Sequence, residues 1–268
     1  MTSTLSTPVG DIEVRRLGRG PTLVYLHSAV GEGEGLAVLD LLAQHFDVVA
    51  PMFPGYGASE GIERIDDMED VAFHLLDLWD GLGLDAPAVV GNSLGGWMAL
   101  ELAVRYPARV SALVLVNPVG LYIEGSPIKD VFGRTPAELA EDFFADPEHP
   151  MAQMMRLLSE MRGSDVPFDV VRPLYQTMSA TARLAWDPYL HNPKLAKRLH
   201  RVAAPTLIVR GAQDTLVPAA HAEAYASAIP GARLVEVERA AHLLALECAE
   251  ELAGLVGRFL GVVEGAQQ

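Results

Sequence analysis

The chain has 268 residues, half of them hydrophobic, and a formal net charge of −15 at pH 7. This composition excludes an intrinsically disordered chain, and the acidic balance disfavours partners that are polyanions, namely nucleic acid and anionic membranes. The length suits one large domain, and a single cysteine, Cys248, excludes an intramolecular disulfide.

The N-terminal segment contains neither a basic stretch nor an apolar run, so it lacks the pattern of a secretory signal. No apolar run in the sequence approaches the length that a membrane span requires. We therefore expect a cytoplasmic protein that does not contact a membrane.

The first elements expected along the chain are strands. Residues 8–17 predict a strand or hairpin, and the apolar runs at 22–27 and 46–51 have the pattern of buried strands. Apolar residues then recur at helical spacing over about 66–82, which predicts a helix. These residues are Met68, Val71, Leu75, Leu78 and Leu82.

The most informative motif is Gly91-Asn-Ser-Leu-Gly95, which has the pattern G-x-S-x-G with Ser93 at its centre. A β-branched run precedes it and a helix-like run to Tyr106 follows it, so Ser93 lies at a sharp turn from strand to helix. Glycines suit this turn because the backbone at the serine is strained and the flanking segments pass close together. The serine is a candidate nucleophile; alternatively, it only caps the helix of a glycine-rich turn.

Residues 110–116 predict another buried strand, which ends at Asn117 without a following carboxylate. The strand pattern then stops between residue 122 and about residue 200, where helical fragments are expected instead. These fragments lie near 136–146, 150–162 and 167–185. On either side of this region strands alternate with helices, which indicates a mostly parallel sheet covered on both faces.

Two more polar residues follow predicted strands. Asp214 comes shortly after the strand at 205–210, and His242 comes directly after the alternating strand at 233–238. The carboxyl ends of parallel strands share one edge of a sheet, where open α/β folds hold their sites. Simpler interpretations are that Asp214 caps a helix starting near Pro218 and that His242 is an ordinary loop histidine.

The order Ser93, Asp214, His242, each after a strand, resembles that of the α/β-hydrolases. The segment from Phe53 to Ser59 also resembles that family's P-G-x-G-x-S segment, and the resemblance extends from about residue 10 to residue 262. It implies the α/β-hydrolase fold, a mostly parallel central sheet with helices on both faces and an inserted helical cap. The implied division is a core of residues 1–121 and 201–268 and a cap of residues 122–200.

The resemblance implies a catalytic triad in which Ser93 is the nucleophile, His242 the general base and Asp214 the acid that orients the base. No cofactor or metal is implied. The last helix of the core is expected from Cys248 to about Leu260.

The turn after His27 corresponds to the family's His-Gly turn, so the resemblance places the oxyanion hole at the backbone N–H groups of Ala29 and Leu94. The family usually has Gly directly after the histidine, where this chain has Ser28. If that position requires a positive φ, the turn must differ here. Ser28 could alternatively offer its hydroxyl to the site.

The activity implied is hydrolysis of a small to medium carboxylic ester, as in carboxylesterases. A serine at this turn argues against haloalkane dehalogenases and epoxide hydrolases, which use aspartate. One alternative is a hydrolase of C–C bonds in ring-fission products (vinylogous diketo acids), although many of these carry Trp where this chain has Leu243. In that case a cap arginine could bind the substrate carboxylate: Arg162, Arg172 or Arg183. A ligand receptor with slow turnover on the same fold is an alternative of another class.

The cap is implied to cover the serine and to form the substrate pocket. Its Met and aromatic side chains suit an adaptable apolar pocket, but most of them could instead hold the cap helices together. The candidates are Met154, Met155, Met178 and Trp186, and beside them Phe143, Phe144, Met151 and Tyr189. The expected partner is a small apolar ester or ketone, without nucleic acid or membrane; monomer and homodimer both remain open.

Overall fold

The computed structural model describes residues 1–33, 35–162 and 165–262. Its strands are β1 (Thr2–Ser6), β2 (Asp11–Gly18), β3 (Thr22–Leu26), β4 (Asp47–Pro51), β5 (Ala88–Asn92), β6 (Ala112–Val116), β7 (Thr206–Gly211) and β8 (Arg233–Val237). Its α-helices are α1 (Ala37–Leu42), α2 (Met68–Gly81), α3 (Leu94–Arg105), α4 (Pro136–Phe143), α5 (Pro150–Glu160), α6 (Phe168–Ala185), α7 (Ala219–Ala228), α8 (Leu244–Glu247) and α9 (Ala249–Phe259).

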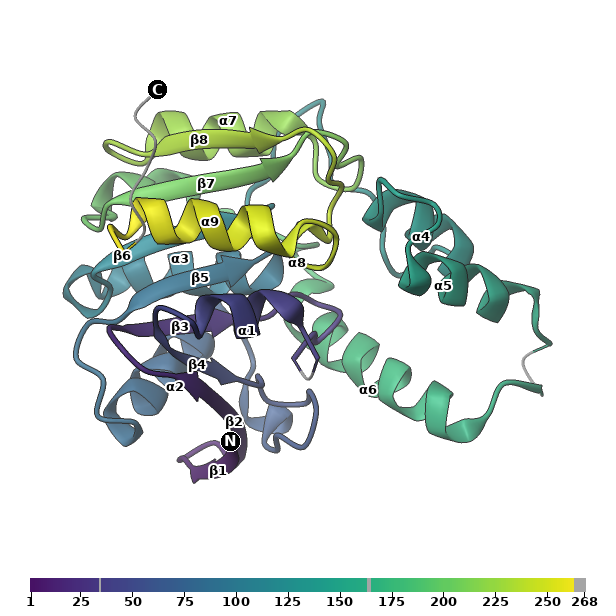
Figure 1. Ribbon diagram of the computed structural model, residues 1–268, viewed down its shortest axis with the longest axis horizontal. Helices are drawn as coiled ribbons and strands as arrows, with labels where there is room; N and C mark the ends of the chain where they lie inside the picture. The colour runs from purple at the N-terminus through teal and green to yellow at the C-terminus, as the bar shows by residue number, and fades with distance from the viewer. Residues whose placement is uncertain (34, 163–164, 263–268) are drawn as a thin grey trace.

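The strands form one sheet in the order β1-β2-β4-β3-β5-β6-β7-β8 (Figure 1). β1 and β2 pair antiparallel at one edge, and β2 pairs antiparallel with β4. All pairs from β4 to β8 are parallel. The carboxyl ends of these strands therefore share one edge of the sheet, as expected for an α/β fold.

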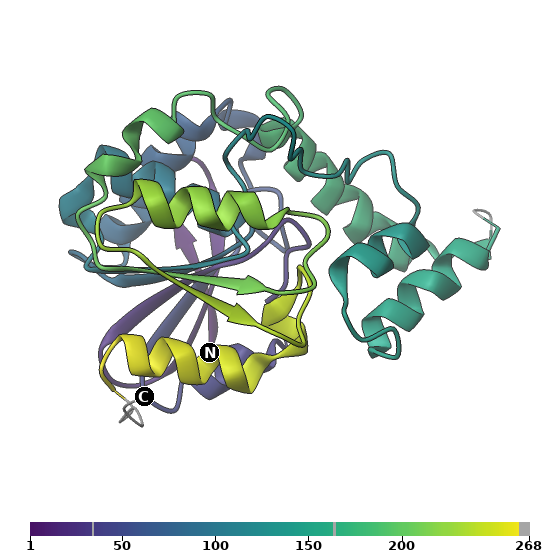
Figure 2. The same cartoon turned by 90° about the horizontal axis from the view of Figure 1, so that it is seen from above.

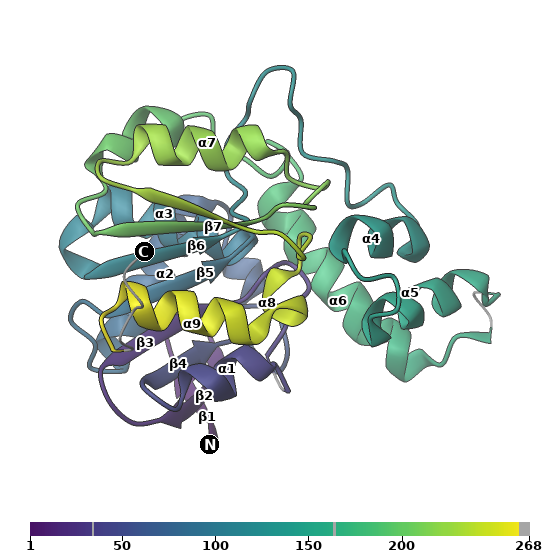
Figure 3. The same cartoon turned by 45° about the horizontal axis from the view of Figure 1, so that its top comes forward.

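Helices cover both faces of the sheet: α1, α8 and α9 lie on one face, and α2, α3 and α7 lie on the other (Figures 2 and 3). Successive strand residues point to opposite faces, so Val89 packs in the core with α2 and α3, whereas Val90 packs in the core with α1 and α9. Central strands that are buried on both faces require continuous apolar runs, which explains why these strands could be predicted from the sequence.

The helices α4, α5 and α6 lie outside the layers of the sheet, beyond the carboxyl ends of the parallel strands (Figure 1). A capping box of Thr135 and Glu138 begins α4, and the side chain of His149 caps α5. The C-terminal part of α6 returns to the core, where Ala180, Thr181 and other residues are buried. The three helices match the three helical fragments predicted from the sequence.

Three elements differ from the sequence-based expectation. β1 was not expected, because it pairs only with β2 at the sheet edge and its mostly exposed residues carry no apolar pattern. α1 was also missed, since it is only six residues long and its first turn has no side-chain cap. The helix expected from Cys248 to about Leu260 is confirmed as α9, whereas the four-residue helix α8, which Cys248 at a φ of −128° separates from α9, was not expected.

The division into core and cap stays a prediction. The helices α4 to α6 all lie between residues 122 and 200, which is the range assigned to the cap. Parts of both assigned ranges, residues 163–164 and 263–268, lie outside the described residues.

Candidate active site

Ser93 occupies the turn between β5 and α3, with a φ of 49° and a ψ of −107°. A positive φ is unfavourable for a residue with a Cβ, so the surrounding structure must hold it. Its N–H donates to the carbonyl of Val116 at 2.8 Å, and its carbonyl accepts from the N–H of Trp97 at 3.2 Å. The turn is thereby fixed from both sides, with the hydroxyl at the carboxyl edge of the sheet.

The two glycines of the motif are required because a side chain at either position would not fit. A Cβ on Gly91 would lie 2.5 Å from the carbonyl oxygen of Gly95. A Cβ on Gly95 would lie 2.2 Å from the carbonyl oxygen of Leu26 and 2.6 Å from that of His27. The helix α3 can approach the ends of β3 and β5 this closely only without side chains at both positions.

The structure brings Ser93, His242 and Asp214 together. The His242 Nε2 atom lies 2.9 Å from Ser93 Oγ, and Nδ1 lies 2.9 Å from Asp214 Oδ2. All three side chains are buried. The imidazole therefore contacts a hydroxyl on one side and a carboxylate on the other, which is the geometry a nucleophile, base and orienting acid require.

Asp214 uses its second oxygen in its own loop. Oδ1 accepts hydrogen bonds from the N–H groups of Leu216 at 3.0 Å and Val217 at 2.9 Å. The structural interpretation of this aspartate and the functional one are therefore compatible, because one oxygen stabilises the turn while the other faces the imidazole.

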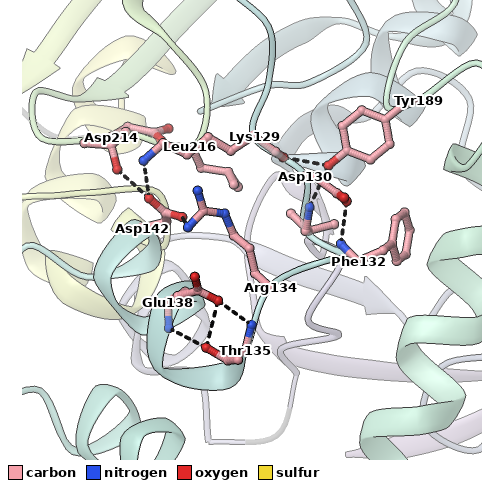
Figure 4. Close-up of polar contacts among 12 residues, drawn as sticks. Lys129, Asp130, Phe132, Arg134, Thr135, Glu138, Asp142, Tyr189, Asp214 and Leu216 are labelled. Carbon is pink, nitrogen blue, oxygen red and sulfur yellow. Dashed lines mark hydrogen bonds and ion pairs between the residues drawn. The ribbon is translucent and has the colours of Figure 1, made fainter. Parts of the chain in front are cut away.

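The cap holds the loop that carries Asp214 (Figure 4). On α4 the buried carboxylate of Asp142 accepts from the hydroxyl of Thr215 at 2.8 Å and from the ammonium of Lys129. It also pairs with the guanidinium of Arg134 at 3.1 Å. The backbone N–H of Lys129 donates to the carbonyl of Leu216 at 3.1 Å. The position of the acid thus depends on the first part of the cap.

The loop of His242 is also fixed by contacts that the sequence did not reveal. Asn117, at a φ of 42°, donates to the carbonyls of Ala241 at 3.0 Å and His242 at 2.8 Å. Its Oδ1 accepts from the N–H of Gly211 at 2.9 Å. Asn is one of the few residues that adopt a positive φ readily, and that preference was the only available signal.

The loop of His242 also contacts the cap. The ring of Phe143 is stacked on the imidazole of His242, with centroids 5.9 Å apart and an angle of 29° between the planes. The carboxylate of Glu247 accepts from the N–H of Ala241 at 2.7 Å and, with its other oxygen, from the N–H of Ala145 at 2.7 Å. Phe143 is one of the apolar residues expected to line the pocket, and its ring lies against the imidazole.

The expected oxyanion donors belong to different elements. The N–H of Leu94 opens α3 directly after Ser93, and Ala29 lies in the loop after β3. Within the described ranges neither N–H is assigned an acceptor. A helix N-terminus favours negative charge, so the amide of Leu94 is suited to bind an oxyanion.

Ser28 does not behave as either alternative proposed from the sequence. In the part of the chain that the structure describes, positive φ angles at residues other than glycine occur at Ser93, Asn117 and Leu190, so the position of Ser28 does not require glycine. Its hydroxyl donates to the carboxylate of Glu32 and accepts from the N–H of Val30 at 3.2 Å. The hydroxyl is therefore held by the loop itself.

His27 has a defined tautomer. Its Nε2 lies 2.9 Å from the N–H of Phe53, which can only donate, so the ring proton is on Nδ1 and donates to the carbonyl of Ser28 at 2.7 Å. Burial lowers the pKa of His27 below its ordinary value, against the opposing effect of Glu32. The imidazole is therefore a neutral structural bridge under the loop.

The pocket candidates lie on the cap with different exposure. Met154 and Trp186 are exposed by 55% and 63%, and the Trp186 ring contacts that of Phe132. Met155 and Met178 are half-buried. None of these positions tests whether the side chains contact a substrate, so their role stays a prediction.

Arg183 is not free to bind a substrate carboxylate. Its guanidinium donates to the carbonyls of Ile65 at 2.8 Å and Glu63 at 3.0 Å, and pairs with Asp66 at 2.8 Å. Its role is to attach α6 to the core, which corrects the interpretation of Arg183 as a substrate ligand.

A family model for the alpha/beta hydrolase fold matches residues 21–248 of the chain. The chain belongs to the α/β-hydrolase fold family. Among the α/β-hydrolases of known structure, a membrane phospholipase A described as a bacterial virulence factor superposes with a TM-score of 0.81 at 22% identity, over 98% of this chain and 86% of the other. At that identity the likeness shows the fold.

Three curated relatives have different activities. The chain is 31% identical to the dihydrolipoyllysine-residue acetyltransferase component of an acetoin cleaving system from Cupriavidus necator, over 92% of this chain but only 65% of that protein. It is 30% identical to a 2-hydroxymuconate semialdehyde hydrolase from Pseudomonas sp. strain CF600, over 93% and 90% of the two chains. It is 28% identical to a pimeloyl-[acyl-carrier protein] methyl ester esterase from Xanthomonas campestris pv. campestris, over 92% and 98%.

Two kinds of feature are absent from the described residues. No helix among them is long and apolar enough to cross a membrane. No group of three or more His, Cys, Asp or Glu side chains among them is arranged to hold a metal ion.

Proposed function

We propose that this α/β-hydrolase is a serine esterase that cleaves small to medium carboxylic esters through an acyl-enzyme. The observation that carries the proposal is the continuous contact from Ser93 Oγ through the imidazole of His242 to Asp214, at 2.9 Å in each step. The ester hydrolase among the curated relatives supports the choice of substrate class.

The first half of the reaction acylates the serine. His242 Nε2 takes the proton of Ser93 Oγ as the oxygen attacks the ester carbonyl, and Asp214 stabilises the resulting imidazolium. The amides of Leu94 and Ala29 bind the oxyanion of the tetrahedral intermediate, and each such donor contributes about 3 kcal/mol to transition-state stabilisation. The imidazolium then returns its proton to the departing alkoxide, which leaves as the alcohol.

The second half regenerates the enzyme. Water gives a proton to His242 Nε2 and its oxygen attacks the acyl carbonyl, so that the carboxylic acid is released and the proton returns to Ser93 Oγ. This sequence consumes one water for each ester cleaved and uses only residues of the chain. We assign the apolar side chains of the cap, among them Met155 and Met178, to the walls of the acyl or alcohol pocket.

Cleavage of a C–C bond is the second candidate function, because one relative, which is 30% identical to this chain, is a 2-hydroxymuconate semialdehyde hydrolase. One feature of the site weighs against it. Leu243, which is buried, follows His242 where many such hydrolases have Trp. Of the three arginines considered for the substrate carboxylate, Arg183 is engaged with the core, which leaves Arg162 and Arg172.

The test is a panel of p-nitrophenyl esters from acetate to laurate, given to wild type and to Ser93→Ala in parallel, with a vinylogous diketo acid as the competing substrate. Rapid turnover of esters that depends on Ser93 supports the esterase, and the chain-length profile sizes the pocket. Faster turnover of the diketo acid supports C–C hydrolysis instead. Tight binding with only a few product equivalents per chain supports a receptor.

A further inference from the structure

A half-buried carboxylate lies behind the loop of the proposed oxyanion hole. Glu32 accepts four hydrogen bonds: Oε1 from the hydroxyl of Tyr25 at 3.1 Å, the N–H of Ser28 at 2.9 Å and the amide of Asn92 at 2.7 Å, and Oε2 from the hydroxyl of Ser28 at 2.5 Å. Such a carboxylate has most of its acceptor capacity used within the protein. No step of the proposed reaction needs a carboxylate at this point.

Two of the three residues that donate to Glu32 are adjacent in sequence to residues of the proposed site. Ser28 directly precedes Ala29, which supplies one proposed oxyanion donor, and Asn92 directly precedes Ser93. One carboxylate therefore ties the loop after β3 to the end of β5, where the nucleophile begins. We propose that Glu32 is a positioning residue, which holds the N–H of Ala29 in place relative to Ser93 Oγ.

The peptide groups on either side of Ser28 explain how Glu32 positions the N–H of Ala29. The carbonyl of Ser28 accepts from His27 Nδ1 at 2.7 Å and from the N–H of Gly31 at 3.1 Å. Because a peptide group is planar, fixing this carbonyl also fixes the direction of the Ala29 N–H. Glu32 holds the preceding peptide through the N–H of Ser28, so both planes that meet at Ser28 are restrained.

The charge of Glu32 does not explain its presence. A negative charge close to a developing oxyanion raises the energy of the transition state, and four donors only moderate that repulsion. The benefit must therefore come from the geometry that the carboxylate imposes. Ser28 takes part in it directly, since a glycine at this position would offer no hydroxyl to Oε2.

Two substitutions of Glu32 separate the effect of its hydrogen-bond geometry from the effect of its charge. In Glu32→Gln, the amide oxygen can keep the three donors of Oε1, and the amide nitrogen can donate to the hydroxyl of Ser28, which also acts as an acceptor. In Glu32→Ala, the N–H of Ser28 and the amide of Asn92 lose their acceptor, so the loop is free to move. Gln therefore preserves the restraint without the charge, and Ala removes both.

The inference rests on the proposed function, so wild type and Ser93→Ala are measured first with p-nitrophenyl esters. We expect Glu32→Ala to lower kcat by about tenfold to a hundredfold, somewhat less than the loss of a whole oxyanion donor, with KM little changed. Its affinity for a trifluoromethyl ketone, whose adduct with a serine places an oxyanion in the hole, should fall by the same factor. Glu32→Gln should keep kcat and ketone affinity close to wild type.

The inference is overturned if Glu32→Ala keeps the wild-type kcat, if its defect appears only in KM, or if the ketone affinity is unchanged. It is also overturned if Glu32→Gln loses as much activity as Glu32→Ala, since the charge would then be the cause. Should Glu32→Ala fail to fold, Ser28→Ala is decisive, because it removes only the contact to Oε2 and should lower kcat and ketone affinity together. Wild type without turnover that depends on Ser93 would instead refute the proposed function, and the inference with it.

Discussion

Asn117 donates both amide hydrogens to the loop of His242, at 3.0 Å to the carbonyl of Ala241 and 2.8 Å to that of His242. Its side-chain oxygen accepts from the N–H of Gly211 at the end of β7. One buried side chain at the end of β6 thus connects the strand that leads to Asp214 with the loop that carries the base.

We expect Asn117→Ala to lower the free energy of unfolding by about 3 kcal/mol, because three buried backbone groups lose their partner. It should also lower kcat, since the imidazole is less restrained. Urea denaturation and ester hydrolysis measure the two effects. Asn117→Gly is the matched control: it removes the same hydrogen bonds but tolerates the φ of 42°. If Asn117→Ala unfolds at the same urea concentration as wild type, the role given to this side chain is wrong.

Ser93 carries backbone strain that substitution can release. Because Ser93→Ala keeps the Cβ at a φ of 49°, it should retain the wild-type stability while kcat falls by about 10⁴ to 10⁶. Ser93→Gly should be equally inactive but more stable by about 1 kcal/mol. Thermal unfolding of the two variants gives the comparison. Equal stability of the two would show that the turn is not strained.

Asp214→Asn tests the two functions of this side chain separately. The N–H groups of Leu216 and Val217 hold the amide oxygen on their side, so the amide nitrogen faces His242 Nδ1. The imidazole must then carry its proton on Nε2, where it cannot accept the proton of Ser93. We expect kcat to fall by about 10⁴ with little loss of stability. Unfolding of this variant at 25 °C would show instead that the carboxylate is mainly structural.

We expect His74 to make the stability of the fold sensitive to acid. It is buried in α2 against the ring of Phe53, and burial lowers its pKa to about 4 from 6.5. Neither ring nitrogen has a hydrogen-bond partner in the described structure. Between these two pH values the unfolded chain binds a proton that the folded chain does not, so stability falls as the pH falls, by about 3 kcal/mol over the range.

His74→Leu removes this titration without depriving another polar group of its partner. The free energy of unfolding, measured from pH 4 to 7, should therefore vary less steeply with pH in the variant than in wild type. At pH 7 the variant should be at least as stable as wild type. Parallel pH profiles for the two proteins would exclude His74 as the source of the acid sensitivity.

Much of the fold could be predicted because its central strands are buried on both faces. Continuous apolar runs therefore marked β3 to β7, and the G-x-S-x-G motif marked the turn where steric limits leave only glycine at Gly91 and Gly95. The edge strand β1 could not be predicted, since its exposed residues follow no apolar pattern. The helix α8 was also not predicted, because four residues are too few to show a helical apolar pattern.

The three triad candidates could be predicted because each follows a strand of the sheet. The residues that hold them could not, because their partners are distant in sequence: Asn117 contacts residue 242, and Glu32 contacts Asn92. Such contacts depend on the strand order, which periodicity does not give. The role of Ser28 likewise could not be predicted, because it depends on Glu32. The carboxylate of Glu32 accepts a hydrogen bond from the hydroxyl of Ser28, which a glycine would lack.

The role of Ser93 as nucleophile is tested most directly by titration with a p-nitrophenyl alkylphosphonate, whose stable adduct resembles the tetrahedral intermediate. We expect release of about one p-nitrophenolate per chain, loss of ester turnover in proportion, and a phosphonyl group on the peptide that contains Ser93. Ser93→Ala should release none. Turnover that persists after complete labelling, or a label at another residue, would contradict the account.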